Sequence, residues 1–260
     1  MDFTMGRRGV VWKTPDITAD GLKLFACAVM LIQYIGIVIV EKGIIHLEKY
    51  TQAGLSDAMA QDSRLMTWAG VGSVMQLIGG MALPIFTFLL VEGFLNTSSY
   101  RKYLISMTLF ALISEIPYDF AMSGKVFDWS GQNAMAGMCI SLLMLYFLRM
   151  LQEKKGFGKI ALQALIVVCA VIWAALLRVQ YGLCIVLLTA IFYIFYARNV
   201  LKTVLGILVS LLYVTGPLSF YGIWCYTGER KDRLPKYAYY AFYPLMLLVL
   251  GAGARLGLKA

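Results

Sequence analysis

The chain has 260 residues, of which 60% are hydrophobic and 14% are charged, and its formal net charge is +9. A soluble domain carries about 25% charged residues, whereas apolar stretches long enough to cross a bilayer, about 20 residues each, recur throughout this chain. The basic residues lie in short tracts between the apolar stretches, as topology signals and lipid-headgroup contacts do, so neither a soluble protein nor a nucleic-acid partner is expected.

The apolar stretches predict an all-α, polytopic transmembrane bundle that forms one integral-membrane domain in a lipid bilayer. Basic residues precede the first stretch, as in a secretory signal. That stretch is too long for a signal core and lacks a small-residue cleavage site, so we expect a retained anchor. About eight spans are predicted, at residues 22–40, 68–91, 103–122, 132–151, 160–177, 181–197, 201–225 and 237–254.

Cysteine and histidine give no sign of a metal site. All five cysteines lie inside apolar stretches, without the paired spacing of metal ligands, and are expected to be small packing residues. The only histidine, His46, lies in the polar loop 41–67 and is expected to be solvated. We therefore predict no bound metal.

The second span is rich in glycine, which lets membrane helices approach closely. Pro84 would clash with the carbonyl group of Gly80, so a kink is expected near the middle of this span. Glu92 follows at its end. This acid either belongs to a binding site or lies at the membrane interface facing the basic pair Arg101 and Lys102.

The third span carries two acids four residues apart, Glu115 and Asp119, which therefore lie on one helix face. Pro117 between them loosens the backbone. Ionisable groups inside a bilayer are costly and mark a functional site by default, although two interfacial caps are the alternative. The fourth span opens with Gln132 and Asn133, which either cap the helix or hold a carbonyl or amide group of a ligand.

The later spans include a tight hairpin at 178–180, a stretch broken by Thr-Gly-Pro at 215–217, and a last span that opens with tyrosines, as an aromatic belt does. Eight spans would place both termini on one side, and that side has the larger share of lysine and arginine. The termini are therefore expected to be cytoplasmic.

This topology brings residues from five spans toward the non-terminal face of the membrane. We take this convergence as the main indication of a cleft there. The residues concerned are Glu115, Asp119, Gln132, Asn133, Gln180, Tyr226, Glu229, Arg230 and Tyr243.

Two stretches, P-I-F-T-F-L-L-V-E-G-F at 84–94 and I-S-E-I-P-Y-D at 113–119, resemble the TraX-like membrane proteins. Matches at 132–133, 181–182, 226–230 and 236–244 extend the resemblance over nearly the whole chain. The family is named for a conjugation protein that acetylates the pilin N-terminus. It is similar to multi-span acyltransferases that use acyl-coenzyme A. The resemblance therefore implies the bacterial cell membrane and, for an active member, acetyl- or acyl-coenzyme A.

The chain departs from the family pattern where the pattern has ionisable groups. Three histidines, two acids and one arginine of the pattern are replaced by neutral residues. An Asp-His pair is replaced by Gln33-Tyr34, the arginine by Gly80, two histidines by Gly131 and Met246, and the second aspartate by Gln180.

Acyl transfer needs a base for the nucleophile's proton, usually histidine, and donors for the oxyanion. The neutral replacements cannot act as bases near neutral pH, and Tyr34 can only donate. We therefore expect a divergent or non-catalytic member, without a cofactor, that binds a lipid, peptide or protein partner. Gln33, Tyr34 and Glu92 are expected to take part in that binding.

The alternative is an active transferase that acylates an amine or hydroxyl group of a peptide, protein or small-molecule acceptor. Glu115 or Asp119 would then act as the base, Tyr34 and the 132–133 pair would hold the acyl carbonyl group, and the basic residues at 230–236 could meet the coenzyme phosphates. A small transporter is a third reading, with little support because no internal repeat is visible.

Overall fold

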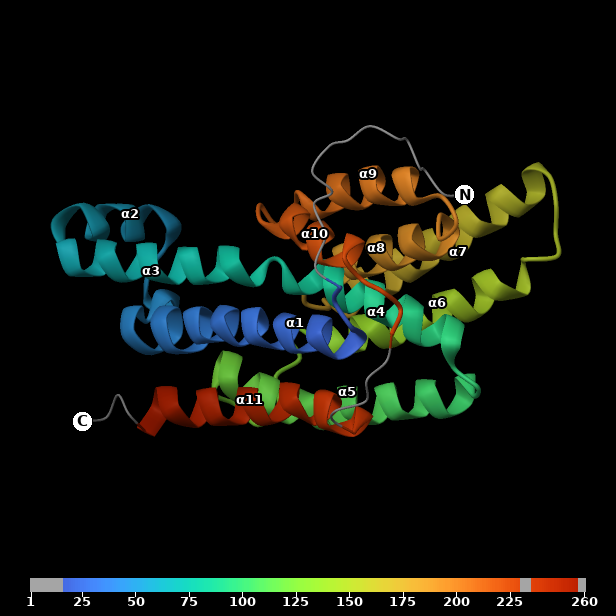
Figure 1. Cartoon of the computed structure of the whole chain (residues 1–260). Coiled ribbons are helices and arrows are strands. Elements are labelled where there is room, and N and C mark those ends of the chain that lie inside the picture. The colour runs from blue at the N-terminus through green and yellow to red at the C-terminus, as the bar shows by residue number, and fades with distance from the viewer. Residues whose placement is uncertain (1–15, 230–234, 257–260) are drawn as a thin grey trace, which may run out of the picture.

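The structure, a computed structural model, describes residues 16–229 and 235–256, and every regular element in this part of the chain is a helix (Figure 1). This confirms the all-α prediction. The elements are α1 Ala19–Tyr34, η1 Ile35–Ile45, η2 Leu47–Lys49, α2 Gln52–Gln61, α3 Ser63–Gly79, α4 Ala82–Asn96, α5 Tyr100–Ser123, α6 Ala134–Met150, α7 Phe157–Leu176, α8 Gly182–Ile194, α9 Asn199–Ser210, η3 Gly216–Leu218, α10 Ser219–Trp224 and α11 Lys236–Leu256.

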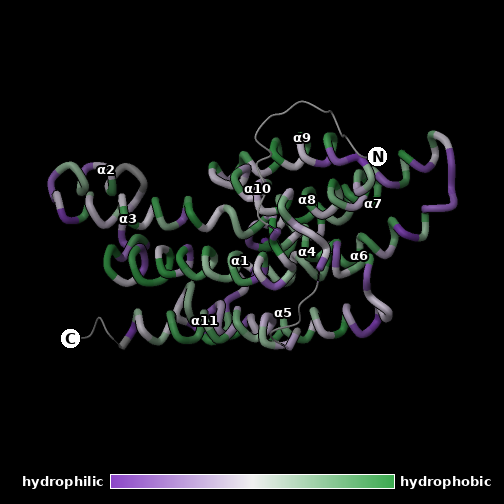
Figure 2. Tube along the Cα trace, viewed as in Figure 1, coloured by the Kyte–Doolittle hydropathy of each residue, from purple (hydrophilic) through white to green (hydrophobic). Residues whose placement is uncertain are grey.

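Five helical stretches in the described residues are long and apolar enough to cross a membrane, and α6, α8 and α9 are shorter apolar helices. Hydrophobic residues dominate the helices, while the loop between α6 and α7 is hydrophilic (Figure 2). The chain is therefore a multi-span membrane bundle. The five long stretches are Ala19–Ile45, Ser63–Asn96, Tyr100–Ser123, Phe157–Leu176 and Tyr237–Arg255.

The predicted kink in the second span is confirmed. Helix α3 ends at Gly79 and α4 begins at Ala82, so the break lies just before Pro84. In a regular helix the proline ring would clash with the carbonyl group four residues earlier. The hydroxyl group of Thr215 donates to the Leu77 carbonyl group at this break. A local steric rule of the sequence thus fixes where the helix bends.

The stretch 201–225, predicted to be one span, is instead a hairpin of two short helices, α9 and α10. The two legs lie side by side, because the indole nitrogen of Trp224 donates to the Thr203 hydroxyl group at 3.1 Å. A Cβ atom on Gly216 would lie 2.5 Å from the Ser210 carbonyl oxygen, so the turn between the legs is tight. The chain enters and leaves the bundle at the same end.

This hairpin changes the topology that follows it. Helix α11 begins beside the start of α1, where the Tyr239 hydroxyl group donates to Asp20 at 3.3 Å. It ends beside the end of α5, where Arg255 donates to the Phe120 carbonyl group at 3.0 Å. The start of α1 and the end of α11 therefore lie at opposite ends of the bundle (Figure 1). The termini themselves lie outside the described residues, so the expectation that both are cytoplasmic stays a prediction.

Candidate functional site

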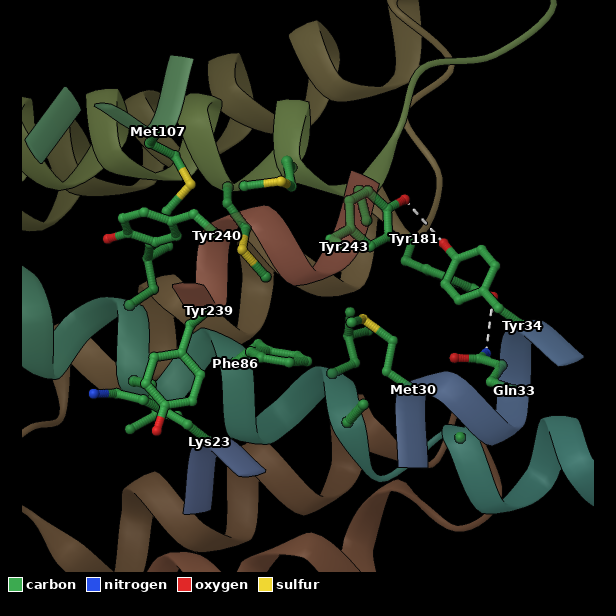
Figure 3. A pocket seen from close by; sticks show the side chains of 18 of the residues that line it. Lys23, Met30, Gln33, Tyr34, Phe86, Met107, Tyr181, Tyr239, Tyr240 and Tyr243 are labelled. Atoms are coloured by element: carbon green, nitrogen blue, oxygen red, sulfur yellow. Dashed lines mark hydrogen bonds between the residues drawn. The ribbon is translucent and has the colours of Figure 1, made fainter. Parts of the chain in front are cut away.

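A cavity of about 190 Å³ lies inside the bundle, between α1, α4, α5, α6 and α11 (Figure 3). Its walls are mainly methionine, leucine and aromatic side chains, among them Met30, Phe86 and Met107. Lys23 lies at one end with Tyr239, and Tyr34 lies at the other. The cavity therefore follows α1 for most of its length.

A network of neutral polar groups closes the end near Tyr34. The Tyr34 hydroxyl group donates to Gln180 Oε1 at 2.7 Å and lies 3.0 Å from the Tyr243 hydroxyl group, while Gln33 Nε2 donates to the Tyr181 hydroxyl group at 2.9 Å. Tyr34 and Tyr243 are buried, and their rings meet edge to face. Two consecutive residues on α1 thus pair with two consecutive residues before α8, glutamine with tyrosine in both cases.

The turn between α7 and α8 presents Gln180 and Tyr181 to α1. Arg178 and Tyr181 both have positive φ, at 50° and 60°, which reverses the chain within a few residues. Gln132 holds this turn through its backbone: its N–H donates to the Arg178 carbonyl group at 3.2 Å, and its own carbonyl group accepts from Gln180 N–H at 2.9 Å. Gln132 thus positions the network rather than lining the cavity.

Asn133 and Glu115 form a separate, buried contact between α5 and α6. The Asn133 side chain accepts from Ala136 N–H at 3.2 Å, as an N-cap does, and donates to the Ala111 carbonyl group at 2.9 Å and to Glu115 Oε2. Its backbone N–H also donates to Glu115 Oε2, at 3.3 Å. Glu115 does not line the cavity. Glu115 instead accepts hydrogen bonds from the residue that caps α6.

Asp119, one turn further along α5, orders the loop before α6. It is buried and accepts from Asp128 N–H at 2.8 Å. Asp128 itself is partly exposed in that loop, where hydrogen bonds from Ser123 and Ser130 hold the pKa of its carboxyl group below the ordinary value.

The expected convergence of nine residues on one face is only partly found. Tyr226 and Glu229 lie at the other end of the bundle, because the segment after α10 pairs with the start of α1: Ala19 N–H donates to the Glu229 carbonyl group at 3.0 Å. The Tyr226 ring packs on Phe88 at a centroid distance of 5.3 Å, and Glu92, buried nearby, accepts from the Tyr196 hydroxyl group. The hairpin fold of α9 and α10 causes this separation. Arg230 lies outside the described residues.

Sequence reasoning did not single out most of the cavity wall. Met30, Phe86, Met107 and Tyr240 lie on four different helices. Each lies three or four residues from another lining residue, such as Gln33 or Tyr243, so helical spacing was the available signal. Spacing alone does not say which helix faces turn toward one another.

One family model, described as TraX protein, matches residues 18–252 of this chain. The chain belongs to the TraX family. No curated protein and no solved structure matches it.

The residues that the resemblance sets against ionisable groups of the family pattern lie at or near the polar end of the cavity. Gln33, Tyr34 and Gly80 line it, and Gln180 is hydrogen-bonded to Tyr34. Met246 is buried one helical turn after Tyr243 on α11. Gly131 precedes Gln132, and a Cβ atom there would lie 3.3 Å from the Arg178 carbonyl oxygen of the same turn.

Replacing Tyr34 with phenylalanine is expected to lower the free energy of unfolding by about 1–3 kcal/mol, because buried groups of Gln180 and Tyr243 lose their partner. The midpoint of thermal unfolding in detergent micelles measures this change. Tyr221→Phe, at an exposed position on α10, is the matched control and should change the midpoint little. Equal midpoints for the two variants would show that the network does not stabilise the fold.

Proposed function

We propose that this TraX-family protein is a non-catalytic member that binds a single-chain lipid in the cavity along α1. The observation that carries the proposal is the neutral Tyr34–Gln180–Tyr243 network at the cavity's closed end. A transferase needs a base within hydrogen-bond reach of the acceptor. Here the polar groups satisfy one another, and tyrosine, with a reference pKa of about 10, is a donor near neutral pH.

The shape and chemistry of the cavity support a lipid rather than a peptide or protein. Methionine and aromatic walls adapt to an apolar chain. Lys23, at the end near the start of α1, pairs with Asp20 at 3.3 Å and lies 4.9 Å from the centre of the Tyr239 ring. From Lys23 to Tyr34 the helix rises about 16 Å. An apolar chain would lie along this length, with an anionic headgroup near Lys23.

Filling the cavity should weaken this binding. Met30→Trp adds volume to the cavity wall, and we expect it to weaken binding of a fluorescent fatty acid, titrated into the protein in detergent, by about tenfold or more, the effect of losing about 1.4 kcal/mol. Met66→Trp, at a position on α3 that is 60% exposed, is the matched control. Equal affinities for the two variants and the wild type would contradict the proposal.

The runner-up is an active acyltransferase of the cell membrane with acetyl- or acyl-coenzyme A as donor. One observation favours it: Glu115 Oε1 is buried and has no hydrogen-bond partner among the described residues. Of the basic residues expected near the coenzyme phosphates, Lys236 begins α11, whereas Arg230, Lys231 and Arg233 lie outside the described part of the chain.

Radiolabelled acetyl-coenzyme A with purified protein and membranes separates the two functions. We expect neither a labelled acceptor nor coenzyme hydrolysis. A labelled product that disappears in Glu115→Gln would establish the transferase instead.

A further inference from the structure

Tyrosine side chains form the wall that closes the cavity along α1 at its polar end. The hydroxyl groups of Tyr34 and Tyr243 lie 3.0 Å apart, and the rings of Tyr181 and Tyr213 pack edge to face with their centroids 5.1 Å apart. All four residues line the cavity. An apolar chain that reached past them would have to separate hydrogen-bonded groups inside the bundle, which is costly. The cavity therefore has a fixed end on this side.

The helices that line the cavity set its length. On α1 the lining residues run from Lys23 to Tyr34, a rise of about 16 Å. On α4 they run from Ala82 to Leu90, a rise of about 12 Å. An extended hydrocarbon chain advances about 1.3 Å per carbon atom, because its tetrahedral angles shorten each bond of about 1.5 Å along the chain axis. A straight chain of about nine to twelve carbon atoms therefore spans the cavity.

The volume of the cavity gives an independent estimate. The cavity measures about 190 Å³. An engineered protein cavity of about 150 Å³ binds benzene, which has six carbon atoms, so at the same filling this cavity holds about eight. Volume and length therefore agree on a chain of about eight to twelve carbon atoms. An extended hexadecanoyl chain, about 20 Å long, exceeds both estimates.

The side walls adapt more easily than the end wall. Met30 on α1, Met107 on α5 and Met138 on α6 line the cavity between its two ends. Methionine side chains are flexible and fit irregular apolar groups. The tyrosines of the end wall are instead held by hydrogen bonds and ring contacts. A bend in a bound chain is therefore tolerated, whereas extra length is not.

We propose that the cavity along α1 selects a medium-length acyl chain, of about eight to twelve carbon atoms, and that its tyrosine end wall sets the upper limit. This inference rests on the lipid-binding function proposed above and names the class of lipid. The methyl end of the chain meets the tyrosines, and the headgroup lies near Lys23. A shorter chain leaves part of the apolar wall without contacts, and a longer one has carbon atoms that the cavity cannot take up.

The first test measures how well fatty acids of increasing length displace a fluorescent fatty acid from the protein. The series is hexanoate, octanoate, decanoate, dodecanoate and hexadecanoate, in a steroid-based detergent that has no straight chain to enter the cavity. Transfer into an unrestricted apolar phase would tighten binding about fourfold for each added methylene group. We expect the affinity to be highest between octanoate and dodecanoate, with hexadecanoate weaker than the best chain by about tenfold or more.

A change in the cavity wall should move this optimum. Met30 lies one helical turn before Tyr34 on α1, and Met30→Ala removes side-chain atoms from the wall, so the preferred chain should lengthen by about two to four carbon atoms. Met66→Ala, at a position on α3 that is 60% exposed, is the control and should leave the optimum unchanged. Partition of each acid into the detergent is the same for both variants, so a shift between them reports the cavity.

The outcomes separate this inference from the function on which it rests. Affinity that rises steadily to hexadecanoate, or an optimum that Met30→Ala does not move, would overturn the chain-length limit, while the lipid-binding function would stand. If none of the acids binds, the lipid-binding function fails, and this inference fails with it. Monoacyl phospholipids of the same chain lengths should show the same optimum. An optimum that changes with the headgroup would mean that the tyrosine wall does not set the limit.

Discussion

Replacing Gly79 with alanine is expected to lower the free energy of unfolding by about 3 kcal/mol or more, the upper part of the range for overpacked cores. A Cβ atom at this position would lie 2.1 Å from Cβ of Gln33, an atom close to the backbone of α1 that no side-chain rotation can move away. Helices α1 and α3 would have to separate. The loss is measured as a shift in the unfolding midpoint in detergent.

Gly70, on the same helix, provides the matched control for this prediction. A Cβ atom at Gly70 meets no atom within 4 Å, so Gly70→Ala should not destabilise the protein and can raise helix stability slightly. If Gly79→Ala and Gly70→Ala have equal midpoints, the close approach of α1 and α3 is not what holds Gln33 in place. The Gly79 variant should also lose the Gln33–Tyr181 hydrogen bond, since α1 carries Gln33 with it.

Replacing Asn133 with alanine is expected to cost about 3 kcal/mol or more. The variant loses an N-cap, about 1 kcal/mol, and leaves both the Ala111 carbonyl group and the Glu115 carboxylate without this buried donor, at about 1–3 kcal/mol for each group. Asn133 is fully buried, so water cannot replace the lost bonds. The same unfolding measurement reports the loss.

Thr51→Ala is the control that measures the loss of a helix cap alone, without the loss of buried side-chain contacts. Thr51 caps α2 by accepting from Gly54 N–H at 3.2 Å at an exposed site, so its loss should cost only about 1 kcal/mol. Adding Glu115→Ala to Asn133→Ala should cost less than the sum of the single changes, because the second change removes the orphaned carboxylate. An Asn133→Ala variant that costs no more than Thr51→Ala would mean that Glu115 is not held by this contact.

The two predictions for Gly79 and Asn133 both concern residues that support the hydrogen-bond network around Tyr34. Gly79 lets Gln33 pack between α1 and α3, and Gln132, next to Asn133, holds the turn that presents Gln180 to Tyr34. The proposed lipid site therefore depends on helix packing at Gly79, which is part of its wall, and at Asn133, which is not. Variants at Gly79 and Asn133 are expected to weaken fatty-acid binding as well as stability, whereas Tyr221→Phe should affect neither.

The sequence alone determined the features that depend on composition and on local sterics. Apolar stretches must be buried or face lipid, and their backbone N–H and C=O groups must be hydrogen-bonded within the protein. A multi-span all-α bundle therefore followed from the number and length of these stretches. The break before Pro84 followed from the clash of a proline ring with the preceding turn. Both features, the helical bundle and the break before Pro84, depend on residues close together in the sequence, and the structure confirms both.

Only the tertiary structure decided whether the interrupted apolar stretch 201–225 crosses the bundle or folds back. Helix α10 packs against α4, which lies far earlier in the sequence, and α9 packs against α8, the helix just before it; these contacts turn the stretch into a hairpin. The hairpin sends Tyr226 and Glu229 to the end where α1 begins, and leaves Gln33, Tyr34, Gln180 and Tyr243 together at the other. Hydropathy does not encode such pairings, because each apolar helix can be buried equally well against several neighbours, and close packing of particular side chains selects one arrangement.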